Sequence, residues 1–204
     1  MHSHPRPFLA ALALGLSLLV TACGTPPWQA KTSSPTPSAP ASPTAPVIND
    51  LAAGSLKRSI KAGAATLSVT YWSTLDLAQW TPGVPKPLNV VVSAALDGGA
   101  KGQQTFLTAV RVATTASGAD GSPRVLDAVD DTATVTPGYL ISKPNSYSQV
   151  LRLPAAPDGS TAVQIALTYE LLIQSEPKAS TYQRQVASDT IHVPLVVAGP
   201  SPSS

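Results

Sequence analysis

Apolar and polar residues alternate along VQIALTYELLI, residues 163–173, and this period of two constrains the fold more than any other feature of the sequence. The odd positions are all apolar, whereas Gln164, Thr168 and Glu170 occupy even positions. Because successive side chains of a strand point to opposite faces of a sheet, one face meets a core and the other meets water. The pattern predicts a half-buried antiparallel strand.

Similar runs recur along the chain and are predicted to form further strands. They cover Ala65–Trp72, Leu88–Leu96, Thr105–Thr114, Arg124–Val129, Tyr147–Leu153 and Ile191–Val197. Turn-forming sequences such as Asp97-Gly98-Gly99 and Pro157-Asp158-Gly159 separate them. No stretch has the sustained apolar period of a helix.

About seven or eight short strands with frequent turns are typical of an antiparallel β-sandwich. An immunoglobulin-like topology is the first expectation for this all-β domain, without the disulfide of antibody domains, and a jelly roll or an open barrel is the alternative. Pro194 adds a detail, because proline cannot donate a hydrogen bond to a neighbouring strand. We expect the last strand to lie at a sheet edge, or its proline to face away from a neighbour.

The only cysteine, Cys23, follows an uncharged run from Phe8 to Val20, and Arg6 is the only charged residue before it. A basic start followed by an apolar run that ends in small residues is typical of a secretory signal peptide. The run is shorter than the roughly 20 apolar residues that a membrane-spanning helix needs. A lone cysteine cannot form an intramolecular disulfide, so folding must rely on burial and hydrogen bonding.

The quartet Val20-Thr21-Ala22-Cys23 resembles the lipobox of bacterial lipoproteins. The resemblance implies that a dedicated peptidase cleaves after Ala22 and that the Cys23 thiol carries a diacylglyceryl group, with acyl chains such as palmitate. Two or more acyl chains hold a protein stably on a membrane. The expected location is the extracytoplasmic face of the cell membrane, or an outer membrane if the cell has one. An ordinary cleaved signal, with Cys23 near the cut by chance, is the alternative.

On this interpretation the chain divides into four parts. They are a lipoprotein signal peptide at 1–22, a lipidated cysteine with a flexible Pro/Ala/Ser/Thr-rich linker at 23–46, a β-sandwich domain at 47–198 and a disordered tail at 199–204. A linker of this composition favours extended polyproline II, which rises about 3.1 Å per residue. It would hold the domain tens of ångströms away from the membrane.

The residue types of common catalytic and metal sites are scarce. After signal cleavage the only histidine is His192, whereas a catalytic nucleophile needs a base beside it. A zinc site needs more His or Cys ligands than remain, and Asp127, Asp130 and Asp131 lack the spacing of an EF-hand loop. Two carboxyl groups across a cleft would suit glycoside hydrolysis, but no such pair stands out. We therefore expect no enzyme activity, no catalytic residue, no metal and no cofactor.

Basic and acidic side chains nearly balance once Arg6 leaves with the signal peptide. The densest basic group, Lys57, Arg58 and Lys61, is too small to indicate nucleic acid. The partner that the sequence predicts directly is the membrane, through the lipid on Cys23. The oligomeric state stays open.

The connection from Tyr71 to Pro87 holds two of the three tryptophans of a chain that is poor in aromatic residues. Trp72, Trp80 and Lys86 are the candidate binding residues, because exposed aromatic side chains on rigid loops bind sugars, peptides and partner proteins. In the alternative, Trp72 caps the core and Trp80 folds back to cover a sheet edge.

Together these observations predict a tethered, non-enzymatic binding or protein-interaction module of the cell envelope, whose partner is an envelope protein or a glycan. The first alternative is a carrier of a lipid or another apolar ligand, which requires a hollow rather than a filled β core. An envelope hydrolase is a more distant alternative.

Overall fold

The structure is a computed structural model, and it describes residues 48–197. All of these residues belong to one compact unit. The predicted signal peptide at 1–22, the cysteine and linker predicted at 23–46, and the predicted tail at 199–204 all lie outside the described residues. Within the described part of the chain we find no helix of the length and hydropathy that crossing a bilayer would require.

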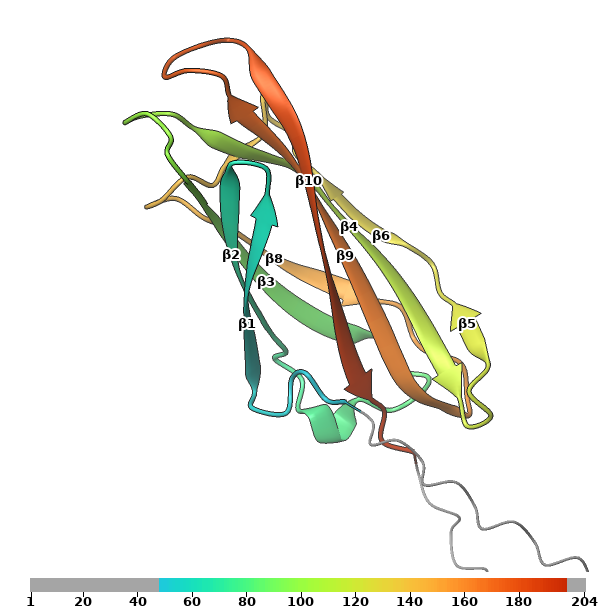
Figure 1. Cartoon of the computed structure of the whole chain (residues 1–204). Coiled ribbons are helices and arrows are strands. Elements are labelled where there is room, and N and C mark those ends of the chain that lie inside the picture. Colours follow the sequence, from blue (N-terminus) through green and yellow to red (C-terminus); the bar gives the residue numbers. More distant parts are fainter. Residues whose placement is uncertain (1–47, 198–204) are drawn as a thin grey trace, which may run out of the picture. The chain divides into compact units, whose positions relative to one another are not determined.

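Two antiparallel sheets pack face to face (Figure 1). The four-stranded sheet has the order β1-β2-β3-β8, and the six-stranded sheet has the order β10-β9-β4-β5, with β6 and β7 also paired to β4. The strands of the first sheet are β1 Ser55–Ala62, β2 Ala65–Trp72, β3 Lys86–Leu96 and β8 Tyr147–Leu153. Those of the second are β4 Thr105–Gly118, β5 Pro123–Val125, β6 Val129–Thr132, β7 Tyr139–Leu140, β9 Ser160–Gln174 and β10 Tyr182–Pro194. A short 3-10 helix, η2 Leu77–Gln79, lies in the connection between β2 and β3.

The chain crosses between the sheets in the manner of an immunoglobulin-like sandwich. Strand β3 leads to β4 in the other sheet, β8 returns to pair with β3, and β9 crosses again to pair with β4. The neighbours β2-β3-β8 and β10-β9-β4 thus take the places of strands A-B-E and G-F-C of that fold. Strand β1 is an addition outside β2. The predicted β-sandwich is confirmed, and its sheets keep open edges instead of closing into a barrel.

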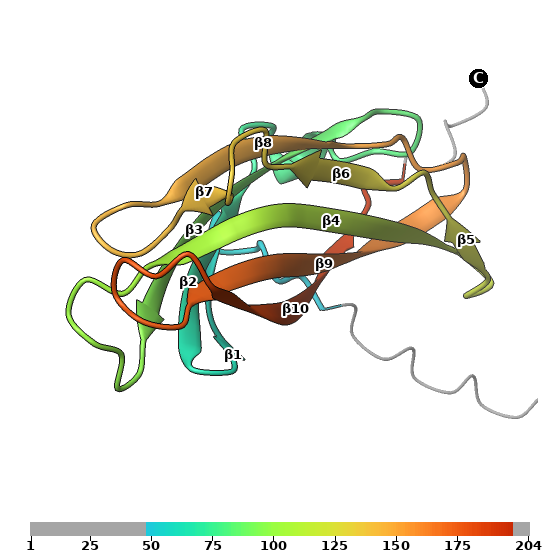
Figure 2. The same ribbon diagram turned by 90° about the horizontal axis from the view of Figure 1, so that it is seen from above.

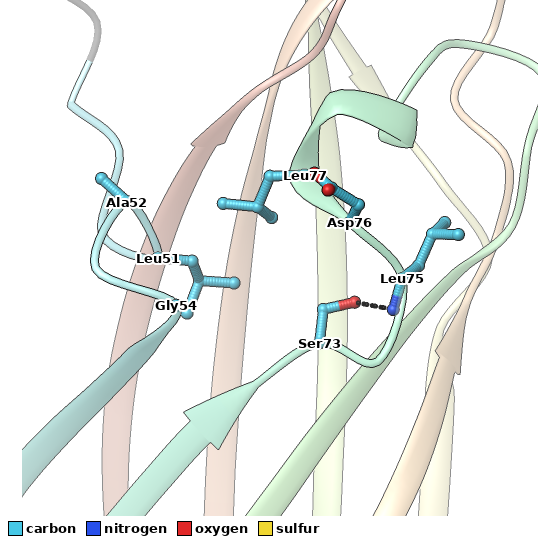
Figure 3. Close-up of a pocket in the computed structure, with 7 residues that line it drawn as sticks. All are labelled: Leu51, Ala52, Gly54, Ser73, Leu75, Asp76 and Leu77. Carbon is cyan, nitrogen blue, oxygen red and sulfur yellow. Dashed lines mark hydrogen bonds between the residues drawn. The ribbon is translucent and has the colours of Figure 1, made fainter.

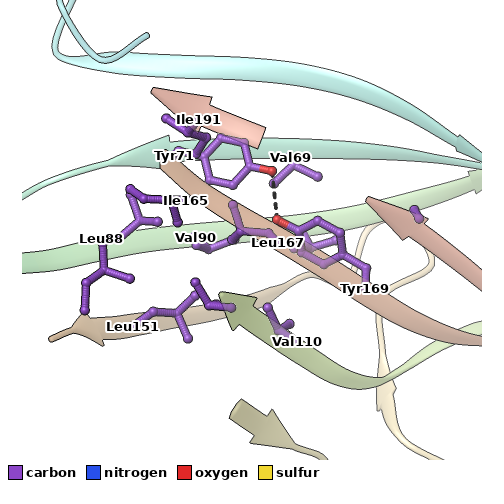
Figure 4. Close-up of a cluster of buried hydrophobic side chains, with 14 of the residues drawn as sticks. Val69, Tyr71, Leu88, Val90, Val110, Leu151, Ile165, Leu167, Tyr169 and Ile191 are labelled. Atoms are coloured by element: carbon purple, nitrogen blue, oxygen red, sulfur yellow. Dashed lines mark hydrogen bonds between the residues drawn. The ribbon is translucent and has the colours of Figure 1, made fainter. Parts of the chain in front are cut away.

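The alternation that predicted β9 determines how the core is filled. The odd-numbered apolar side chains of residues 163–173 are all at most 4% exposed. Those at positions 163–171 pack in one cluster with side chains of the facing sheet, such as Val69, Leu88 and Val90 (Figure 4). Fully burying one side chain of this size contributes about 1.5–3 kcal/mol. Because residues from both sheets form one cluster, the side chains of the two inner faces fill the space between the sheets.

Polar groups also enter this core. The hydroxyl groups of Tyr71 and Tyr169 lie 2.8 Å apart and share a hydrogen bond (Figure 4). The Tyr71 hydroxyl lies 2.9 Å from Asp189 Oδ2, to which it donates. Two tyrosines from opposite sheets therefore satisfy each other, with one carboxylate of β10, at the side where β1 and β10 face each other.

The N-terminal segment of the domain is fastened to the end of β10. Asp50 N donates to His192 O at 2.9 Å, and His192 N donates to Asp50 Oδ2 at 2.8 Å. Arg58 of β1 donates to the other Asp50 oxygen at 3.1 Å and lies 3.8 Å from Asp189. The chain thus enters the sandwich at the end where β10 finishes, close to η2 (Figure 1).

The predicted strand limits fit the structure unevenly. The predictions for Ala65–Trp72 and Tyr147–Leu153 match β2 and β8, and β10 lies at a sheet edge, as Pro194 indicated. The predicted Arg124–Val129 strand is wrong, since that region divides between β5 and β6. The last strand begins nine residues before its predicted start at Ile191 and ends at Pro194, and β1 was not predicted at all.

Candidate functional site

The four lipobox residues Val20, Thr21, Ala22 and Cys23 lie outside the described residues. Lipidation at Cys23 and cleavage after Ala22 therefore stay predictions from the sequence. The remaining predicted residues lie at the connection between β2 and β3: Trp72 ends β2, Trp80 follows η2, and Lys86 begins β3.

Trp80 does not present its ring to a ligand. It is 0% exposed and belongs to the core cluster. Its indole Nε1 donates to Ser73 Oγ at 3.3 Å, and its carbonyl accepts from Val196 N at 2.9 Å. The indole therefore covers the end of the core and ties the last residues of the chain to the β2–β3 connection. The expectation of an exposed Trp80 is wrong, and the alternative in which this side chain folds back matches its burial.

Lys86 is equally internal, with 1% of its surface exposed. Its Nζ donates to Thr81 O at 2.8 Å and also to Val84 O. Burial lowers the pKa of this ammonium group. Lys86 thus stabilises the turn that precedes β3. Trp72, at the end of β2, is only partly exposed.

A pocket of about 340 Å³ lies beside this connection (Figure 3). Leu51, Leu75 and Leu77 form its apolar walls. Ser73 Oγ donates to Pro87 O at 2.8 Å and accepts from Leu75 N at 3.1 Å, and Asp76 caps η2 by accepting from Ala78 N at 2.8 Å. Ser73 Oγ and one Asp76 oxygen thus bind the local backbone.

Strands β6 and β7 lie beside β8 on one side of the sandwich (Figure 2). Residues of these three strands line a second pocket, of about 440 Å³. We call it the tyrosine pocket. Its lining residues are Asp131, Val135, Gly138, Tyr139, Leu140, Ser146, Tyr147, Ser148 and Gln149.

Two stacked aromatic rings form the wall of the tyrosine pocket. The rings of Tyr139 and Tyr147 have centroids 5.7 Å apart and planes inclined by 28°. Tyr147 is buried and donates its hydroxyl to Asp131 of β6. Burial, followed by the hydrogen bond to Asp131, raises the pKa of the Tyr147 hydroxyl. Tyr139 keeps part of its surface exposed.

The backbone beside the pocket is held from both sheets. Ile141 N donates to Thr105 O at 3.0 Å, and Ile141 O accepts from Ala94 N at 2.7 Å. Because Thr105 belongs to β4 and Ala94 to β3, this residue links the two sheets next to Tyr139. The backbone next to the tyrosine pocket is therefore hydrogen-bonded to both sheets, although the pocket lies at an open edge of the sandwich.

The acidic group DAVDD does not converge on one point. Asp130 pairs with Arg111 at 3.2 Å, and Arg111 also donates to Glu170 at 2.7 Å. Asp131 faces the tyrosine pocket instead, through its bond with Tyr147. His192 lies on β10, where its Nδ1 is 3.6 Å from Asp50 Oδ2.

Comparisons with protein families, with curated proteins and with solved structures find no match for this chain. The function must therefore be inferred from the residues. One signal of the tyrosine pocket was present in the sequence: Gln149 is a polar residue at an inward-facing position, between Tyr147 and Leu151. This signal indicates a pocket only when the position of the neighbouring β6–β7 segment is known, and the sequence of that segment has no clear apolar period.

Proposed function

We propose that the protein is a lipoprotein anchored through Cys23 at the extracytoplasmic face of the cell membrane. There the sandwich acts as a non-enzymatic binding module for a component of the cell envelope. The observation that carries the anchor is the quartet Val20-Thr21-Ala22-Cys23 at the end of an apolar run. The Pro-rich segment after Cys23 supports a spaced tether, because its composition favours an extended chain.

The filled core favours a module that binds its ligand at the surface over a carrier that encloses its ligand. A carrier of a lipid needs an enclosed apolar space, whereas the inner faces of the two sheets pack into one cluster. The larger of the pockets described above is an open pocket with carboxylate, amide and hydroxyl groups in its lining. A surface site for a polar ligand fits this arrangement better than an internal site for an acyl chain.

The use of the acidic residues supports a non-enzymatic role. Arg58 binds Asp50 and Asp189, and Arg111 binds Asp130 and Glu170. A pair of catalytic carboxyl groups needs free oxygen atoms facing one substrate. These four carboxylates instead pair with arginine side chains, so they do not form such a catalytic pair.

The anchor is tested by labelling and fractionation in a bacterial host. Cells producing the full chain are grown with labelled palmitate, and membranes are separated from soluble proteins. We expect the label on the wild-type chain and in the membrane fraction, and we expect Cys23→Ala to lose both. Ser33→Ala, a change in the linker, serves as the matched control. A wild-type chain without label, or an equally labelled Cys23→Ala chain, would contradict the proposal.

The binding role is tested with the chain that cannot be lipidated. Purified Cys23→Ala chain is mixed with envelopes from cells that lack the protein, and bound chain is measured after sedimentation. Saturable binding is expected, and competition with unlabelled chain should remove it. Sedimentation that rises linearly without saturation would show that the sandwich binds no specific envelope component.

A further inference from the structure

The space between the sheets is open at Gln149. Tyr147, Gln149 and Leu151 occupy alternate positions of β8, so their side chains point to the same, inward face. Tyr147 and Leu151 are 7% and 2% exposed, whereas Gln149 between them is exposed. An inward-facing but exposed glutamine marks a place where the facing sheet does not cover β8. That place is the tyrosine pocket.

The polar lining of the tyrosine pocket consists mainly of neutral hydrogen-bonding groups. Ser146 and Ser148 supply hydroxyl groups, Gln149 supplies an amide and Asp131 supplies a carboxylate. Gln149 Oε1 accepts from Val150 N at 3.1 Å, which leaves its Nε2 to donate to a ligand. Asp131 Oδ2 accepts from Tyr147, which leaves Oδ1 to accept from a ligand. The pocket thus combines hydrogen-bond donors and acceptors with the aromatic ring of Tyr139.

The lining disfavours an anionic ligand. It contains no Lys, Arg or His, and its one charged side chain is the carboxylate of Asp131. A phosphate or a carboxylate in this pocket would be repelled, and no cation there would balance it. A neutral ligand has no such cost.

An extended peptide is also disfavoured. Such a peptide would add to the free edge of β8 by bonding to its outward backbone groups. The outward amide of Val150 is already occupied by the side chain of Gln149 at 3.1 Å. The edge next to the pocket is therefore partly closed to strand addition.

We propose that the tyrosine pocket is a binding site for a neutral saccharide. The apolar face of a sugar ring, whose C–H bonds carry partial positive charge, lies against the negative face of the Tyr139 ring. Gln149 Nε2 donates to a ring hydroxyl, and Asp131 Oδ1 accepts from another. The volume of about 440 Å³ lies within the range of about 300–1,000 Å³ for small-molecule pockets. This inference rests on the proposed function, because it names the ligand class of the binding module.

The test uses the purified full chain in detergent and a glycan array that carries neutral and anionic oligosaccharides. Bound oligosaccharides are then measured by isothermal titration calorimetry. We expect a neutral oligosaccharide to bind saturably, and we expect Gln149→Ala to weaken it about tenfold, as loss of a ligand hydrogen bond does. Tyr139→Ala should abolish binding, whereas Tyr139→Phe, which keeps the stacked ring, should retain it. Gln183→Ala, at an exposed position of β10, is the matched control and should leave the affinity unchanged.

Loss of folding is kept separate from loss of the site. Thermal unfolding of each variant shows whether it is folded, and Gln149→Ala, at an exposed position, carries the test if Tyr139→Ala unfolds. The inference is overturned if no neutral oligosaccharide binds, if anionic oligosaccharides or peptides bind in preference, or if Gln149→Ala and Gln183→Ala behave alike. Envelope binding that persists without saccharide binding would overturn this inference alone and leave the proposed function standing.

Discussion

At the scale of single residues, the polar atoms in the core contribute to stability through the hydrogen bonds that they share. Tyr71 is 0% exposed, and its hydroxyl contacts both the Tyr169 hydroxyl and Asp189. Removing it leaves the buried Tyr169 hydroxyl and the partly buried Asp189 carboxylate with one partner fewer, which costs about 1–3 kcal/mol. We expect Tyr71→Phe to lower the free energy of unfolding in urea by that amount. Tyr182→Phe, at a partly exposed position of β10, should stay within about 0.5 kcal/mol of the wild type. Equal effects of the two changes would contradict this role of Tyr71.

The same hydroxyl groups make stability depend on alkaline pH. Burial, reinforced by Tyr169 and Asp189, raises the pKa of Tyr71, and burial raises the pKa of Tyr169. Unfolded tyrosine ionises near pH 10, so above that pH the unfolded chain releases protons that the folded chain keeps. The stabilisation is therefore complete below about pH 10 and is lost as the pH rises further. Urea unfolding at increasing pH should show this fall, and Tyr71→Phe should make it shallower. A wild-type free energy that stays constant through this range would contradict it.

Trp80 and Lys86 show what residue type alone does not reveal. The sequence placed both residues in an unusual connection. A tryptophan in a loop can face either solvent or the core, and the residue type alone does not show which. Trp80 is buried because the end of the sandwich would otherwise be open, and Lys86 is buried because the carbonyl groups of Thr81 and Val84 surround its Nζ. Both facts depend on contacts across the connection, which no local pattern records.

At the scale of elements, close backbone packing holds β7 beside the tyrosine pocket. A Cβ atom on Gly138 would lie 2.7 Å from Leu107 O, at a backbone φ of +156°. We expect Gly138→Ala to push β7 away from β4 and to destabilise the protein more than Gly98→Ala. Gly98 has a φ of +69° with open space around it, so its substitution incurs only the roughly 1–2 kcal/mol of left-handed backbone. Urea unfolding of both variants measures the difference, and a smaller effect at Gly138 would contradict the close approach.

The predicted and missed strands differ in where their side chains face. Strands β2, β8 and β9 lie over the core and alternate visibly, so their existence follows from the sequence. Strand β1 escaped prediction because Arg58 stands at an inward-facing position between Leu56 and Ile60. There it meets Asp50 and Asp189 at the sandwich edge, and this ion pairing replaces apolar contact.

The first half of β10 was missed for a related reason. Residues 182–190 are mostly polar, yet they pair in register with β9 along the edge of the second sheet. This part of the strand is held by backbone hydrogen bonds to β9, which the sequence predicts strongly. Its own side chains therefore show little of the apolar alternation that indicates a strand. The tyrosine pocket was unpredictable in the same way, because it requires β8 and the β6–β7 segment to meet.

At the scale of the whole molecule, the core sets where the domain begins. Every member of the core cluster lies between Leu51 and Leu195. The segment before β1 contributes Leu51, which is 1% exposed, and Asp50, which holds the end of β10. The folded unit therefore needs residues that precede its first strand, while the spacing function proposed for the Pro-rich segment makes no demand on the core.

Two truncations separate these roles. A chain that starts at residue 45 keeps Asp50 and Leu51, so it should unfold in urea at the same midpoint as the full chain. A chain that starts at residue 55 loses the buried leucine, a loss that costs about 2–5 kcal/mol for a core Leu→Ala change, and it also frees the His192 amide. Tryptophan fluorescence, to which buried Trp80 contributes, follows both transitions. A lower midpoint for the first chain would show that residues 1–44 stabilise the sandwich, and an unchanged midpoint for the second would show that the N-terminal segment does not hold β10.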